Sequence, residues 1–143
     1  MSVMNFRVKK LSGERKDIEK KEISNVDVSS NFVITSMRKK RDDRVGDYLL
    51  VNFRFNVQYK PDIGRIDVEG YLWYTSPDLG EVVVEKEGKL EVQSDALKEI
   101  STTILRDSIL EAIDISRKLG LPVPVNLPKV TVKPKEVSFP KAT

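Results

Sequence analysis

The sequence predicts an α+β fold: an antiparallel sheet of four or more strands, one long C-terminal amphipathic helix packed on it, and then an extended proline-rich tail. The first observation is an alternation of apolar and polar residues over most of residues 48–75, typical of strands with one buried face. The second is a helical pattern over residues 94–119. The third is that five of the seven prolines follow Leu121, where the chain must run extended.

Residues 48–75 form two arms of a hairpin, around which we expect the rest of the chain to pack. The arms are joined by residues 60–64, whose early proline and late glycine fit a short turn. Apolar side chains alternate with polar ones along both arms, so one face of the hairpin is predicted to be buried. This buried face comprises Val51, Phe53, Phe55, Val57 and Tyr59 of the first arm with Ile66, Val68, Gly70, Leu72 and Tyr74 of the second. Gly70 within a strand indicates a bulge or close packing.

Less regular segments precede the hairpin. Residues 5–11 are a short strand candidate, and the almost wholly charged residues 14–22 are a solvated strand edge or a loop. Residues 23–37 alternate less cleanly, with a polar middle where a β-bulge would switch the two faces. Residues 38–47 have the composition of a loop.

The segments after the hairpin are also predicted from local pattern. Residues 81–92 form a strand, a small hairpin or a kinked strand, and residues 130–132 add a short strand. We find no internal repeat and no domain boundary. We therefore expect a single domain over residues 1–132 and a flexible C-terminal tail over residues 133–143.

The long helix has clear start and stop signals. Ser94 is a natural N-cap, and Gly120 before Leu121 and Pro122 is a strong stop. Its apolar arc is wider than the roughly 100° that one supporting contact needs. The excess predicts a second contact, most simply with a symmetric partner. The arc comprises Leu97, Ile100, Ile104, Leu105, Ile109, Ala112, Ile113, Ile115 and Leu119.

Composition excludes several classes of function. The chain has 143 residues, enough for one domain with a real core, and its 33% of charged residues give a net charge of only +3. It has no cysteine and no histidine, which excludes thiol and histidine nucleophiles and the usual zinc sites. We predict no cofactor and no metal. Without a long apolar run or a signal-like N-terminus, we expect a cytoplasmic protein, and the composition suits a thermophile.

The basic cluster at residues 38–44 is one candidate site. Such a cluster can contact phosphates and would give salt-dependent binding to nucleic acid. A solvated loop is the favoured interpretation, because Asp42 and Asp43 partly cancel the charge. The possible phosphate contacts are Arg38, Lys39, Lys40, Arg41 and Arg44.

The second hairpin arm carries two further candidate features. Tyr71 and Trp73 stand at positions where the alternation calls for polar residues, so they are either covered by the helix or the tail, or form an exposed aromatic patch that binds other chains. Asp67 and Glu69 could work as an acid–base pair, but with Arg65 on the same face a surface charge ladder is favoured.

The order of these elements resembles the SecB-like fold, that of the export chaperone SecB superfamily. The residues that carry the resemblance are the strand pair at 51–59 and 66–74, the helix at 95–119 and the extended run at 120–128, within a match over residues 23–132. The resemblance implies a small homo-oligomer, a dimer or tetramer, that holds non-native or partner polypeptides in apolar grooves without ATP and without catalysis.

No residue of that family transfers individually to this chain. On physical grounds we expect the polypeptide-binding apolar face, opposite the main core, to comprise Tyr71, Trp73, Val33 and Met37. The alternative is a nucleic-acid-associated or ribosome-associated protein that uses residues 38–44. No insertion into a membrane is expected.

Overall fold

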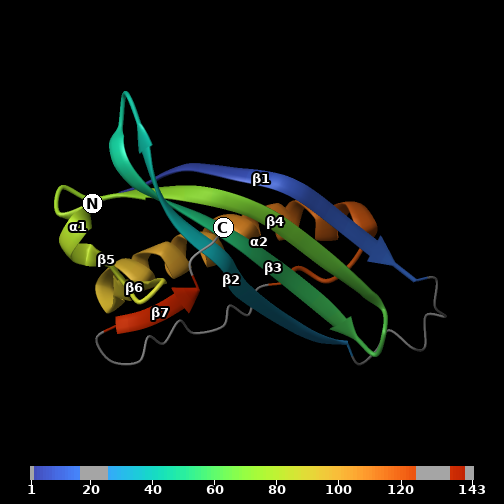
Figure 1. Cartoon of the computed structure of the whole chain (residues 1–143). Coiled ribbons are helices and arrows are strands. Elements are labelled where there is room, and N and C mark those ends of the chain that lie inside the picture. Colours follow the sequence, from blue (N-terminus) through green and yellow to red (C-terminus); the bar gives the residue numbers. More distant parts are fainter. Residues whose placement is uncertain (1, 17–25, 125–135, 141–143) are drawn as a thin grey trace.

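The computed structural model describes residues 2–16, 26–124 and 136–140, which form a four-stranded sheet, a three-stranded sheet and two helices (Figure 1). This confirms the predicted α+β class, with a long helix following an antiparallel sheet. The elements are β1 (Ser2–Arg15), β2 (Asp27–Asp42), β3 (Gly46–Lys60), β4 (Gly64–Thr75), α1 (Leu79–Val82), β5 (Val83–Lys86), β6 (Lys89–Gln93), α2 (Ser94–Leu119) and β7 (Glu136–Pro140).

The large sheet is antiparallel throughout and has the strand order β1-β4-β3-β2. The β3–β4 hairpin therefore lies at its centre, as the sequence predicted. Every residue of the predicted buried face is buried, because alternate side chains of a strand point to the same side of the sheet. We call the side that α2 covers the inner face and the opposite side the outer face.

The apolar arc of α2 is used within the chain. One part of the arc packs on the inner face, against β1, β3 and β4, and α2 also lies beside β6 and β7 of the small sheet (Figure 1). Six of its nine residues are buried and the other three pack partly against the core. The second contact that the arc predicted is therefore the small sheet, so the arc gives no support for a symmetric partner.

A β-bulge in β2 places one predicted site residue on the opposite face of the sheet from the one expected. Ile34 pairs with Phe53 and Ser36 pairs with Asn52, so Thr35 is an extra residue in this strand. The strand changes face at this point. Val33 lies on the outer face and is 51% exposed, whereas Met37 turns inward and is completely buried in the core. The prediction that Met37 belongs to the outer apolar face is wrong.

The edge strand β1 is longer than the predicted segment 5–11, because it pairs along the whole of β4. Its register shifts twice, between Met4 and Arg7 and between Val8 and Lys10. Gly70 faces the second irregularity. A Cβ atom there would lie 2.1 Å from the carbonyl oxygen of Arg7, so close packing of two backbones explains this glycine.

The sequence predicted the C-terminal end of α2 correctly, but not its N-cap. Helix α2 begins at Ser94 itself, and its N-cap is Gln93, which is still paired in β6. The prediction of Ser94 as the N-cap is wrong, because the strand runs straight into the helix. Gly120 ends α2 with a φ of 66°, and the amide of Leu121 donates to the carbonyl of Ser116.

The small sheet has the order β5-β6-β7. Of the three interpretations of residues 81–92, the hairpin is the one observed, and positive φ angles at Glu87 and Gly88 fit its two-residue turn. Strand β7 pairs with β6 and lies within the segment predicted to be a flexible tail. Residues 17–25 and the predicted strand at 130–132 lie outside the described residues. No helix in the described ranges is long and apolar enough to cross a membrane.

Candidate functional site

The outer face of the large sheet carries no helix in the part of the chain that the structure describes, so its side chains define the candidate site. Strand pairing places these side chains in rows that cross the sheet from β2 through β3 and β4 to β1. One row holds Arg38, Leu50, Trp73 and Met4, and the next holds Ser36, Asn52, Tyr71 and Arg7.

Five side chains at one end of the outer face form what we call the aromatic cluster. The rings of Tyr48 and Trp73 stack, with centroids 4.0 Å apart and an interplanar angle of 17°. Tyr48 is only 7% exposed, and the other members are half-buried. The two rings pack against each other, so the cluster is a contiguous apolar surface. Its members are Met4, Tyr48, Leu50, Tyr71 and Trp73.

The structure brings together only part of the predicted apolar face. Tyr71 and Trp73 are close neighbours, and α2 does not cover them because it lies on the inner face. The other predicted cover for Tyr71 and Trp73 was the proline-rich segment, and its residues 125–135 lie outside the described residues. Val33 pairs with Arg54, one row beyond Tyr71, and so lies at the margin of the aromatic cluster.

Sequence reasoning missed three members of the cluster. Tyr48 and Leu50 stand at even positions of β3, where alternation calls for polar residues, and this signal was readable. Met4 had no such signal. Its place beside Trp73 follows from the register between β1 and β4, which joins residues far apart in the sequence.

Cationic side chains border the aromatic cluster. Arg7 lies opposite Tyr71 on β1, while Arg38 and Lys40 lie opposite Leu50 and Tyr48 on β2. Arg7 and Lys40 are exposed and Arg38 is half-buried. In the rows of the cluster, no described residue is a carboxylate. This end of the outer face is therefore both apolar and cationic.

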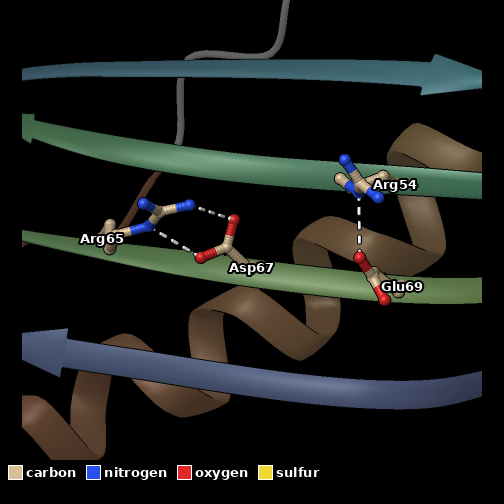
Figure 2. Close-up of polar contacts among 4 residues, drawn as sticks. All are labelled: Arg54, Arg65, Asp67 and Glu69. Atoms are coloured by element: carbon tan, nitrogen blue, oxygen red, sulfur yellow. Dashed lines mark hydrogen bonds and ion pairs between the residues drawn. The ribbon is translucent and has the colours of Figure 1, made fainter.

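The other end of the outer face is a ladder of ion pairs (Figure 2). The Nε atom of Arg54 donates to Glu69 Oε1 at 2.9 Å, and Arg65 donates two hydrogen bonds to Asp67 at 2.8 and 2.9 Å. Each carboxylate is thus occupied by an arginine. This arrangement favours the surface charge ladder over an acid–base pair, and α2 lies behind the sheet in this view.

The basic cluster at residues 38–44 forms the end of the β2–β3 hairpin, which projects beyond the other strands (Figure 1). It is strand as far as Asp42, because β2 pairs with β3 up to Gly46, so the predicted loop is shortened to residues 43–45. Two acidic side chains at this end of the hairpin form contacts within the hairpin itself. Asp42 accepts hydrogen bonds from the amides of Arg44 and Val45, and Asp47 pairs with Arg41 at 3.4 Å.

Two buried tyrosines lie in the core, away from the outer face. The hydroxyl of Tyr59 donates to the carbonyl of Pro122 at 2.7 Å, and burial raises the pKa of this phenol. Burial also raises the pKa of Tyr74, and nearby Glu99 and Asp78 act in the same direction. Both groups are neutral at ordinary pH. No group of three or more acidic residues that could hold a metal occurs within residues 2–16, 26–124 and 136–140.

Comparison with known proteins gives little. No protein-family model matches the sequence, and no curated protein matches it. Among solved structures, one match is a SecB-like chaperone of Mycobacterium tuberculosis in complex with a ChAD peptide from an antitoxin. The two chains are 14% identical, the match covers 93% of this chain and 91% of the other, and the TM-score is 0.44. A likeness of this size carries no argument, so the function must be inferred from the residues of this chain.

Proposed function

We propose that this chain binds apolar segments of non-native or partner polypeptides on the outer face of its large sheet, without ATP and without catalysis. The observation that supports the proposal is the aromatic cluster, which no described helix or strand covers. Contiguous apolar surface of this kind on a soluble domain commonly marks a site for another protein.

The composition of the cluster and the stacking of its two large rings suit this role. Tryptophan, tyrosine and methionine are enriched where proteins bind other proteins, and the two aromatic residues bury much area with little loss of conformational freedom. The stack of Trp73 on Tyr48 holds the largest side chain in place before binding. An apolar segment therefore meets a preformed surface, which lowers the entropic cost of association.

The test uses Trp73, the single tryptophan of the chain. A peptide with an apolar core, titrated into the protein, is expected to shift the Trp73 emission, and the protein is expected to suppress aggregation of a denatured client. Leu50→Ser should weaken peptide binding about tenfold, which corresponds to about 1.4 kcal/mol.

The matched control is Leu110→Ser on α2, where the leucine is 60% exposed and lies away from the outer face. This variant should bind peptide like the unaltered protein. An unchanged emission together with no protection of the client would remove the proposal, as would equal loss of binding in both variants.

The assembly and location of the protein are part of the same proposal. We propose that the protein is cytoplasmic, as its sequence predicts, and that it is a dimer or tetramer. The proposed oligomer rests on the resemblance to SecB-like proteins alone, since the apolar arc of α2 is used within the chain. Static light scattering measures the mass directly, and a strict monomer would contradict this part.

Nucleic-acid binding is the second candidate. It is favoured by the projecting β2–β3 hairpin, where Asp42 and Asp47 are engaged within the turn and Lys39, Lys40 and Arg44 are exposed. Binding of RNA through these residues should weaken steeply between about 50 and about 200 mM salt. Absent or salt-independent binding would eliminate this candidate.

A further inference from the structure

The charge around the aromatic cluster narrows the kind of segment that the outer face accepts. Arg7 borders the cluster on β1 and Lys40 borders it on β2, so an exposed cation stands at each edge with apolar side chains between them. From this arrangement, and resting on the proposed function, we infer that the preferred partner is a short apolar segment with an acidic residue on each side.

The contrast between the two ends of the outer face supports this assignment. The described carboxylates of the face lie towards its two ends. Glu69 and Asp67 in the ladder are held by Arg54 and Arg65, and Asp42, one row beyond Lys40, accepts hydrogen bonds from the amides of Arg44 and Val45. None of them lies in the rows of the aromatic cluster. The exposed cations at the margins of the cluster, Arg7 and Lys40, therefore attract acidic side chains of a bound peptide and disfavour basic ones.

The width of the sheet sets the spacing of those acidic residues. Neighbouring strands lie about 4.8 Å apart, so the three steps from β2 to β1 span about 14 Å. Lys40 also lies four residues along β2 from Ser36, which is in the row of Arg7, and this adds about 14 Å along the strands. The diagonal between the two cations is therefore about 20 Å, which an extended peptide covers in about six residues. The structure thus favours two acidic residues about six positions apart, with apolar residues between them.

The shape of the cluster favours a polypeptide over a single-stranded nucleic acid. Bases stack on rings with an open face. Here one face of Tyr48 is taken by Trp73, and Tyr48 is 7% exposed. Leu50 and Met4 lie beside Trp73 and offer aliphatic contacts, which suit leucine-like and aromatic side chains of a peptide.

The experiment compares three peptides that share one apolar core and differ only in their flanks, which are acidic, uncharged or basic. Binding is followed by Trp73 emission at about 50 and about 500 mM salt. At low salt we expect the acidic peptide to bind at least tenfold more tightly than the basic one, because each exposed charge pair contributes up to a few-fold. At high salt the three affinities should converge.

A double variant locates the effect. Arg7→Gln with Lys40→Gln should abolish the preference for acidic flanks and leave the affinity for the uncharged peptide unchanged. Lys98→Gln, at an exposed position of α2, is the matched control and should keep the full preference.

Each outcome separates this inference from the proposed function. If all three peptides bind equally, or the basic one binds best, the inference is overturned and the proposed function stands. If no peptide binds, the proposed function itself fails. An unstructured oligonucleotide is also added in competition with the acidic peptide. If it binds the protein but does not displace the peptide from Trp73, the inference stands. If it binds at the aromatic cluster more tightly than any of the peptides, the inference is overturned.

Discussion

At the scale of single residues, one insertion decides which side chains of β2 reach the core. Val33 and Met37 are separated by an even number of positions, so a regular strand would place both on one face. The unpaired Thr35 reverses the alternation between them. This explains why the sequence predicted the face of Val33 correctly and that of Met37 incorrectly, since no local signal marked Thr35 as the bulge.

The different positions of these two residues predict different effects on stability. Met37→Ala should lower the free energy of unfolding by about 2–5 kcal/mol, because it leaves a cavity among fully buried side chains. Val33→Ala, at a position 51% exposed, should change it by no more than about 0.5 kcal/mol. Urea denaturation of the two variants measures both values. Similar losses for the two would contradict the assigned faces.

At the scale of elements, a side chain at the end of β1 caps the C-terminus of α2. The Nη1 atom of Arg15 donates to the carbonyls of Leu119 at 3.0 Å and Gly120 at 3.3 Å. Carbonyl groups at the C-terminus of a helix have no partner within the helix and carry partial negative charge. Arg15 supplies both a donor and a positive charge, and so ties the edge strand to the helix.

Replacing this arginine tests the contact. Arg15→Met keeps the aliphatic stem and removes the guanidinium, and should cost about 0.3–1 kcal/mol of stability. The loss should shrink at high salt, because the site is exposed. Arg106→Met is the control, since Arg106 is exposed in the middle of α2 and, among the described residues, forms an ion pair with its neighbour Asp107 alone. Denaturation midpoints that fall equally in both variants would show that the cap contributes nothing.

At the scale of the whole molecule, the buried phenols of Tyr59 and Tyr74 link stability to pH. Burial raises the pKa of each above the ordinary value of 10.0. The unfolded chain therefore loses these protons at a lower pH than the folded chain does. The stabilisation is complete below about pH 10, and it is lost as the pH rises through the higher folded-state pKa values.

We expect the two tyrosines to contribute a steady stabilisation from about pH 8 to 9.5 and a falling one above about pH 10. The double variant Tyr59→Phe, Tyr74→Phe should flatten that part of the decline, since a phenylalanine carries no titrating group. Leu110→Ser, at an exposed position of α2 and without a titrating group, is the control and should keep the unaltered slope. Denaturation series across this pH range measure the slopes, and an unchanged slope in the double variant would refute the linkage.

The sequence by itself determined the central hairpin, the long helix with its end at Gly120, and the buried face of the hairpin. These features follow from local periodicity, because burial repeats every two residues in a strand and about every 3.6 in a helix. Tyr71 and Trp73 were found in the same way, as breaks in that periodicity.

The tertiary structure alone decided the rest. The bulge at Thr35, the use of the helix arc by the small sheet, and the meeting of Met4 and Arg7 with Trp73 and Tyr71 depend on the pairing of segments far apart in the chain. Pairing register is a property of two strands together, so neither sequence segment encodes it alone. The candidate site is apolar and cationic because three separate strands bring those residues to β4.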